Sequence, residues 1–389
     1  MQKYQTLAAV ATALVLSLAC ADHVRAVMSG PCSGCHTMHN SQNNLPMRYD
    51  NGAQPLPQLL RGDCYGCHAQ GLPNALVSVG IDVIPQVYHT EGGDLTTDLA
   101  GGNFAYINGA KGGAAADSKG HNISDLWTVG TDGVLYEPPG GIVQSFHDNG
   151  GNVNTDNLGC AGTNGCHGNR YYDIDGYTGI SGAHHNNVNG QVIQGAGDRE
   201  PGHGYRFLLG VNGYEDPDWQ YTRSDVDHNE YYGRSAPIQL GCGGGAGVVG
   251  CHAYGGVRPP NGTMAEYCAS CHGNFHTLAT SSSNGVGTVA SSPFIRHPSD
   301  LAISNSPDFA TFITYRPDTP VARTTTAELA APDGGVTGTD AVFCLSCHVA
   351  HGSPYPDMLK WDYATMDVGN AGGTGAAGKG CFACHSSKE

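Results

Sequence analysis

Cysteine and histidine are the residues of this chain whose types and spacing could do chemistry. Of its 15 cysteines, 14 form seven pairs, and a histidine directly follows the second cysteine of every pair. Two thiols can add across the vinyl groups of a haem while the adjacent imidazole is delivered to one axial face of the iron. The pattern therefore predicts seven covalently attached haems of the c type.

Five of the pairs have the strict C-x-x-C-H spacing. A random order of residues at this composition would give about 0.03 such matches, so chance does not account for five. Zinc ribbons and redox dithiols also use C-x-x-C, but neither requires the following histidine. The strict motifs are Cys32/Cys35/His36, Cys64/Cys67/His68, Cys268/Cys271/His272, Cys344/Cys347/His348 and Cys381/Cys384/His385.

Two further pairs are stretched. Cys160 precedes Cys166-His167 by six positions, and Cys242 precedes Cys251-His252 by nine. The Cys-His step occurs seven times where chance predicts about 0.7, and the glycine-rich inserts 161–165 and 243–250 can loop out at little cost. We therefore expect haem at both, with a disulfide between Cys242 and Cys251 as the alternative for the longer one.

The N-terminus reads as an export leader, residues 1–26. Lys3 supplies the positive charge near its start, an apolar stretch over 7–19 is too short to span a membrane, and cleavage could follow Ala21 or Ala26. The odd cysteine, Cys20, lies inside this leader, and a lipoprotein acylated at Cys20 is the alternative. No transmembrane segment is expected, and the mature chain is predicted to be extracellular or at the outer-membrane surface, alternatively periplasmic.

Eleven histidines outside the leader and the motifs are available as second axial ligands. Methionine is scarce, so bis-histidine iron with low reduction potentials is expected. His39 and His351 lie three residues after a motif histidine and His276 lies four after one, so each is expected to bind a neighbouring iron, or else to hydrogen-bond a propionate. The other predicted ligands are His121, His297, His89 and His185, the last preferred over His184. His147, His203 and His228 are candidates for any axial position that remains.

Composition favours a fold of mostly irregular coil with few short helices and strands, in which a stack of haems forms the core. The 58 glycines and 21 prolines disfavour long helices. Ser124–Val129 is expected to form a helical turn, and Gly204–Gly210 and Val134–Phe146 short strands. The motifs divide the mature chain into regions 27–125 with haems 1 and 2, 126–240 with haem 3, and 241–389 with haems 4 to 7.

Charge and acidic clusters limit the other partners. A net charge of −16 argues against nucleic acid or an anionic membrane surface. Asp173 and Asp175, and the stretch 148–156, are rich enough in oxygen to bind calcium, although neither completes an EF-hand loop.

The runs Cys32–Gln42 and Cys344–Ser353 resemble the doubled C-x-x-C-H-x-x-H multihaem cytochromes that metal-respiring bacteria of the Geobacter type export. The resemblance implies bis-histidine haems in an alternating parallel and T-shaped chain, with electrons passing to extracellular metal oxides, electrodes or other cytochromes. It also implies possible self-association, because in some relatives one subunit donates a histidine to the next subunit's haem in a filament.

Two function classes remain. The first is a heptahaem electron conduit with no catalytic residues, not an enzyme. The alternative is a terminal reductase of nitrite, hydroxylamine or another oxyanion, which needs a haem with an open axial position and groups that hold and protonate a substrate. A lysine in place of a motif histidine, or a shortage of histidines, would favour the reductase, and neither is present.

Overall fold

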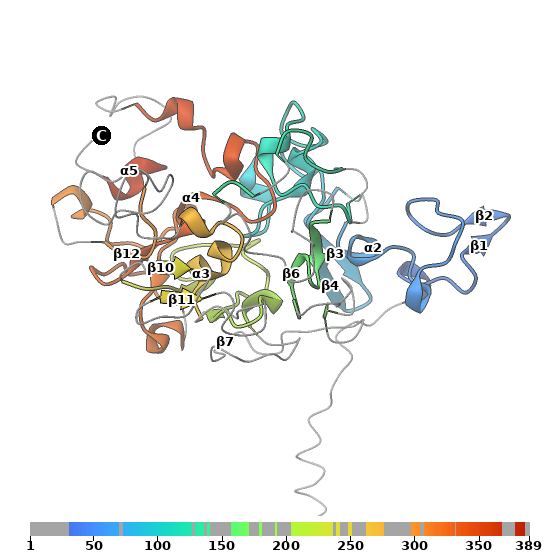
Figure 1. Cartoon of the computed structure of the whole chain (residues 1–389), viewed down its shortest axis with the longest axis horizontal. Coiled ribbons are helices and arrows are strands. Elements are labelled where there is room, and N and C mark those ends of the chain that lie inside the picture. The colour runs from blue at the N-terminus through green and yellow to red at the C-terminus, as the bar shows by residue number, and fades with distance from the viewer. Residues whose placement is uncertain are drawn as a thin grey trace, which may run out of the picture.

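The chain is mostly turns, bends and irregular coil, with short helices and strands between them, as expected (Figure 1). The computed structural model describes residues 31–69, 73–126, 129–135, 138–140, 157–170, 179–180, 191–192, 204–235, 239–241, 248–250, 262–275, 297–303, 307–330, 332–367 and 378–385. Outside these ranges lie the leader, Cys242, Cys251, His252, the two calcium candidates, and His147, His184, His185, His203 and His276. Within the ranges, no helix is long and apolar enough to cross a membrane.

The short helices coincide with the haem motifs. One helical turn places residues three apart on the same face, so both thiols of a C-x-x-C motif point the same way. Side-chain caps begin two of these helices: Asp63 accepts from the backbone N–H of Cys64, and Thr263 accepts from that of Glu266. The helices are α2 (Cys64–His68), α3 (Met264–Ala269), α4 (Cys344–Cys347) and α5 (Cys381–Cys384), with a 3-10 turn η1 (Cys32–Gly34) at the first motif.

Further 3-10 turns lie between the irregular segments. They are η2 (Pro57–Leu59), η3 (Leu95–Thr97), η4 (Phe104–Tyr106), η5 (Asp117–Lys119), η7 (Tyr205–Phe207), η9 (Gly273–Phe275), η11 (Pro307–Phe309), η12 (Thr326–Ala330), η13 (Pro356–Met358) and η14 (Tyr363–Thr365). The strand predicted over Gly204–Gly210 is therefore wrong. Arg206 and Phe207 have φ of 49° and 61°, and this left-handed backbone cannot continue a strand.

The strands form four two-stranded pairs and one larger sheet in the described part of the chain. Antiparallel pairs join β1 (Ser41–Gln42) to β2 (Leu45–Pro46) and β3 (Leu76–Val79) to β4 (Asp82–Pro85). Parallel pairs join β5 (Gly159–Ala161) to β6 (Gly165–His167) and β10 (Gln239–Gly241) to β11 (Val248–Gly250).

The six-stranded sheet combines strands from both sides of residue 241. Its order is β12-β14-β13-β9-β8-β7, and only the β13–β9 contact is parallel. The strands are β7 (Gln191–Val192), β8 (Gly213–Tyr214), β9 (Glu230–Tyr232), β12 (Leu301–Ala302), β13 (Ala322–Arg323) and β14 (Ala341–Val342). The predicted central and C-terminal regions therefore share one sheet.

A buried ion cluster and an aromatic cluster hold this sheet. Arg323 on β13 donates to Glu230 on β9 at 2.8 Å and to Asp340 at 3.0 Å, and all three side chains are buried. The adjacent core contains Tyr205, Val211, Tyr231, Met264, Ala265, Tyr267, Ala322 and Phe343. Since α3 supplies three of these residues, the packing of the sheet also fixes a haem motif.

The first motif lies in a lobe that stands apart from this body. Figure 1 shows β1 and β2 at one side, joined to the rest of the molecule near α2. The lobe has its own hydrogen bonds, in which Asn40 donates to the Gly52 carbonyl and Arg61 donates to that of Met47. Arg61 also covers the Tyr49 ring at 4.4 Å.

Candidate haem sites

The stretched third motif uses paired strands where the strict motifs use a helical turn. Strands β5 and β6 are parallel, with Gly159 opposite Gly165 and Ala161 opposite His167. Cys160 therefore lies beside Cys166 in register, although six positions separate them. Strands β10 and β11 are also parallel, and their register ends at Gly241 opposite Gly250, directly before Cys242 and Cys251. In the described part, none of the cysteines forms a disulfide.

Five motif histidines are oriented by backbone carbonyls. When Nδ1 donates its proton to a carbonyl, Nε2 remains an acceptor that can bind iron. The Nδ1–O distances are 3.1 Å for His36 to Gln58, 2.9 Å for His68 to Pro85, 2.9 Å for His167 to Arg206, 2.7 Å for His272 to Pro139 and 2.7 Å for His348 to Asp357.

Three of these carbonyls belong to the same local structure, which sequence reasoning missed. Gln58, Arg206 and Asp357 each have positive φ, and so does the residue that follows each of them. The next residue is a leucine whose backbone pairs with the motif, in the bridges His36 to Leu60, Gly168 to Leu208 and His348 to Leu359. In the sequence, each of these turns is a polar residue, then an apolar residue, then a leucine. This three-residue pattern is too common to identify the turns without the structure.

Facing imidazoles give the sharpest test of whether haem fits. A transition metal binds an imidazole nitrogen at about 2 Å, so two rings on opposite sides of one iron have centroids roughly 6 Å apart. The ring centroids are 6.1 Å apart for His121 and His272, 6.3 Å for His167 and His351, and 6.2 Å for His297 and His385. The three pairs thus fit bis-histidine iron.

A glycine-lined contact brings His351 to His167. Residues 351–353 lie between 101–103 and 119–121: His351 N–H donates to the Gly101 carbonyl at 2.7 Å, and His121 N–H donates to the His351 carbonyl at 3.1 Å. A Cβ on Gly101 would lie 2.8 Å from His351 Nδ1, and one on Gly120 would lie 2.5 Å from the His351 carbonyl oxygen. Only glycine allows this approach.

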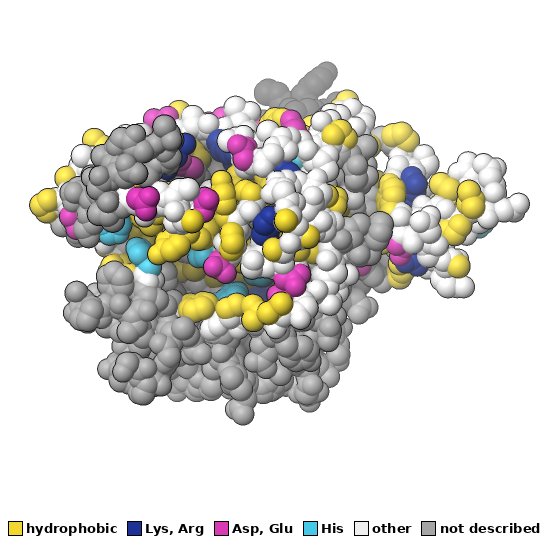
Figure 2. Space-filling view, turned by 90° about the horizontal axis from the view of Figure 1, so that it is seen from above, with side chains coloured by type: hydrophobic (Ala, Val, Ile, Leu, Met, Phe, Trp, Pro, Cys, Tyr) yellow, Lys and Arg dark blue, Asp and Glu magenta, His cyan; other side chains and the backbone are white. Residues whose placement is uncertain are grey.

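Burial keeps the facing imidazoles neutral, which is the form that binds iron. It lowers the pKa of His351 to about 3 and that of His272 to about 4. His351 also stacks on Phe104 at 4.8 Å, and His121 Nδ1 donates to the Ala350 carbonyl at 2.7 Å. Figure 2 shows that some histidine side chains also reach the surface, where they lie beside hydrophobic and acidic side chains.

Two other histidines face carboxylates. Nε2 of buried His89 is 3.0 Å from Asp98, so the iron-ligand role predicted for His89 stays a prediction that would require this pair to open. Both nitrogens of His228 lie at hydrogen-bond distance from acceptor oxygens, 3.0 Å from the Ser224 carbonyl and 3.1 Å from Glu230, and its ring stacks on that of Tyr315 at 3.7 Å. His228 is therefore built into the sheet.

Cysteines of successive motifs lie next to one another. A hydrogen bond with Cys67 lowers the pKa of Cys35 to about 6, and hydrogen bonds with Cys64 and Cys344 raise the pKa of Cys160 and Cys268. Burial raises the pKa of Cys347 to about 12, which the nearby ammonium of Lys360 lowers and Cys381 raises. Burial also raises the pKa of Cys166, which the guanidinium of Arg170 lowers and the neighbouring Cys271 raises.

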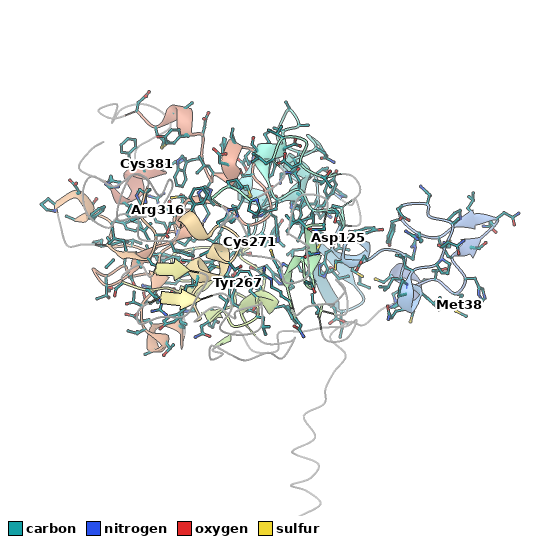
Figure 3. All side chains as sticks on the ribbon, in the orientation of Figure 1. Met38, Asp125, Tyr267, Cys271, Arg316 and Cys381 are labelled. Carbon is teal, nitrogen blue, oxygen red and sulfur yellow. The ribbon has the colours of Figure 1, made fainter. Side chains whose placement is uncertain are left out.

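These thiol interactions, hydrogen bonds in three cases and electrostatic in the other two, order the described sites in one series. It runs from the His36 site through those of His68, His167, His272 and His348 to that of His385. Figure 3 agrees, because Met38 lies in the lobe at one end, Cys381 lies toward the other, and Cys271 and Tyr267 lie between. His39 follows Met38 in this lobe, and its side chain is exposed.

Comparisons with known proteins point the same way. A family model described as the doubled CXXCH motif matches residues 335–389. The C-type cytochrome OmcS of Geobacter sulfurreducens is 24% identical over 92% of this chain and 85% of its own length.

Solved structures are similar at a lower level. A filament of the outer-membrane cytochrome S from the same organism has a TM-score of 0.45 at 20% identity, covering 90% of this chain and 88% of the other. A second structure, of OmcS nanowires, has a TM-score of 0.44 at 20% identity, covering 87% and 84%. From the motifs, their doubled arrangement and the cytochrome relative, the chain is a multihaem c-type cytochrome, an electron-transfer protein similar to a cytochrome of Geobacter sulfurreducens.

Proposed function

We propose that the chain is a heptahaem electron conduit in which every iron has two histidine ligands. The three pairs of imidazole rings with centroids 6.1 to 6.3 Å apart carry this proposal. They pair His272 with His121, His167 with His351, and His385 with His297. Such pairs leave no axial position open for a substrate, and no observation favours the reductase.

Bound haem supplies a one-electron carrier at each site. The protein's part is to attach the carrier through two thioethers, to orient the motif imidazole through its Nδ1 carbonyl bond, and to bury the facing imidazole in neutral form. The series of neighbouring motifs supports passage of electrons along the length of the molecule.

We further propose that the mature chain is exported and assembles end to end, passing electrons to extracellular metal oxides, electrodes or other cytochromes. The exposed His39 supports this, because it lies in the protruding lobe and cannot reach the far face of the haem held by His36. At the opposite end of the series, His297 faces His385, whereas no imidazole in the described part faces His348. We therefore assign His39 of one copy to the His348 haem of the next.

Low-temperature EPR of the fully oxidised protein tests the ligation, with mass spectrometry to count the haems. Seven haems with entirely low-spin ferric iron are expected. A high-spin share near one iron per chain would mean an open site and would overturn the conduit in favour of a reductase.

Electron microscopy of His39→Ala tests the assembly. We expect filaments from the natural chain and separate subunits with high-spin iron from the variant. His228→Gln is the matched control, since both nitrogens of His228 have partners within one subunit, in the Ser224 carbonyl and Glu230, and filaments should persist. Filaments of unchanged spin state from His39→Ala would exclude the proposed crossing ligand.

A further inference from the structure

Arg170 occupies the position at which the doubled motifs have histidine. It lies three residues after His167, as His39 follows His36 and His351 follows His348. His351 uses this position to reach a neighbouring site, where its ring faces His167. Arg170 also reaches a neighbouring site, that of Cys268, Cys271 and His272.

The contacts of Arg170 connect the third motif to the fifth. Its Nη1 donates to Ser270 Oγ at 3.1 Å, and its Nη2 lies 3.9 Å from Cys271 Sγ. Its guanidinium carbon is 5.2 Å from the centroid of the Tyr267 ring, and the Tyr267 hydroxyl donates to the Cys166 carbonyl. Figure 3 shows Tyr267 and Cys271 within the body of the molecule. The guanidinium is thus fixed between the attachment cysteines of two haem sites.

The charge of Arg170 is buried and lacks an acidic partner within the described residues. Its side chain belongs to a residue that is 8% exposed, its Nε makes no hydrogen bond there, and no carboxylate lies within ion-pair distance. A buried charge without a counter-charge is costly, and no carboxylate of the described residues meets this one, whereas each c-type haem at these sites would bring two propionate carboxylates. Arginine at this position therefore points to an electrostatic role.

We propose that Arg170 is a fixed positive charge that raises the reduction potentials of the haems held by His167 and His272. The inference rests on the proposed function, since it requires haem at both sites. Reduction lowers the charge of each haem by one, so a nearby cation stabilises the reduced form, and low surrounding polarity strengthens the effect. His121 already supplies the imidazole that faces His272, so no histidine is needed at residue 170.

Potentiometric titration of Arg170→Gln, followed optically and by EPR, tests the proposal. We expect the ratio of reduced to oxidised iron at a given potential to fall about tenfold for one or two haems, equivalent to 59 mV each. Arg170→Lys retains the charge and should keep most of the natural potential. Arg48→Gln removes one positive charge from the separate N-terminal lobe and should leave these two haems unchanged.

Haem count and spin state separate the possible failures. If Arg170→Gln keeps all haems low-spin and no potential moves, the electrostatic role is excluded while the conduit stands. Equal losses of potential in Arg170→Gln and Arg170→Lys would show a packing role against Tyr267 and overturn the inference. A high-spin haem in the natural protein would contradict the conduit itself, whatever the variants do.

Discussion

At the scale of single residues, the sequence identifies the haem that each motif attaches, but not the histidine that binds the opposite side of its iron. Cys166 and His167 are recognisable because attachment chemistry depends on neighbours in the chain. The ring that faces His167 belongs to His351, which is 184 residues away in the printed sequence. The position of His351 three residues after His348 excludes its own haem, and only the folded chain shows which other haem it serves.

His351→Met tests this pairing. Methionine ligation raises the reduction potential of a haem, so the haem held by His167 should shift upward while the one held by His348 stays near its natural value. EPR-monitored redox titration can follow both, because a histidine–methionine haem has a different low-spin signal. His228→Gln is the control, since both nitrogens of His228 bond within the sheet. An upward shift confined to the His348 haem would contradict the pairing.

At the scale of elements, the helical turns over C-x-x-C motifs could be predicted, because both cysteines lie within one turn. The parallel β5–β6 pair could not, since its register depends on contacts beyond the insert it closes. The prediction of a strand over Gly204–Gly210 failed for a related reason. Two successive left-handed residues form there because the Arg206 carbonyl receives His167 Nδ1, and strand propensity does not contain that contact.

Gly120→Ala tests the contact between residues 119–121 and 351–353. The added Cβ would lie 2.5 Å from the His351 carbonyl oxygen and from Ile107, so one segment must shift. Because this contact places both His121 and His351, we expect partly high-spin iron at the His272 and His167 sites and a loss of about 1–3 kcal/mol in stability. EPR and thermal unfolding measure the two effects.

Gly93→Ala is the matched control for this change, because a Cβ at Gly93 meets nothing within 4 Å. The spin state of the iron and the unfolding temperature of the Gly93→Ala variant should stay close to those of the natural chain. Unaltered low-spin iron in Gly120→Ala would show that the contact between the two segments is not what positions the histidines.

Arg323→Met tests the ion cluster of the six-stranded sheet. It leaves Glu230 and Asp340 buried without their shared cation, and removing one partner from a buried pair costs about 3–5 kcal/mol. Arg316→Met is the control, because the Arg316–Asp318 pair is partly exposed and contributes roughly 0–1 kcal/mol. Chemical unfolding should separate the variants by several kcal/mol. Equal losses would mean that the cluster does not hold β9 to β13.

At the scale of the whole molecule, composition predicted the irregular backbone, because 58 glycines and 21 prolines disfavour long helices. The series of sites could not be predicted, since it follows from thiol contacts between motifs such as Cys64 with Cys160 and Cys268 with Cys344. The sheet that joins residues on both sides of 241 was equally hidden, because its strands are two or three residues long.

Removing attachment cysteines at two places in the series tests whether the haem sites act as one core. Cys268→Ala with Cys271→Ala removes the haem beside α3, whose Met264, Ala265 and Tyr267 belong to the main aromatic core. We expect its unfolding temperature to fall on the order of 10 °C, since a loss of several kcal/mol is spread over a large domain.

The same pair of changes at Cys381 and Cys384 is the comparison, because α5 lies at the end of the series and contributes only Ala383 to a separate buried cluster. That variant should lose one haem, keep the spin state of the others and unfold only a few degrees lower. Haem counting and circular dichroism in the haem band measure both variants. If the terminal change destabilised the chain as much as the central one, stability would depend on haem number and not on position in the series.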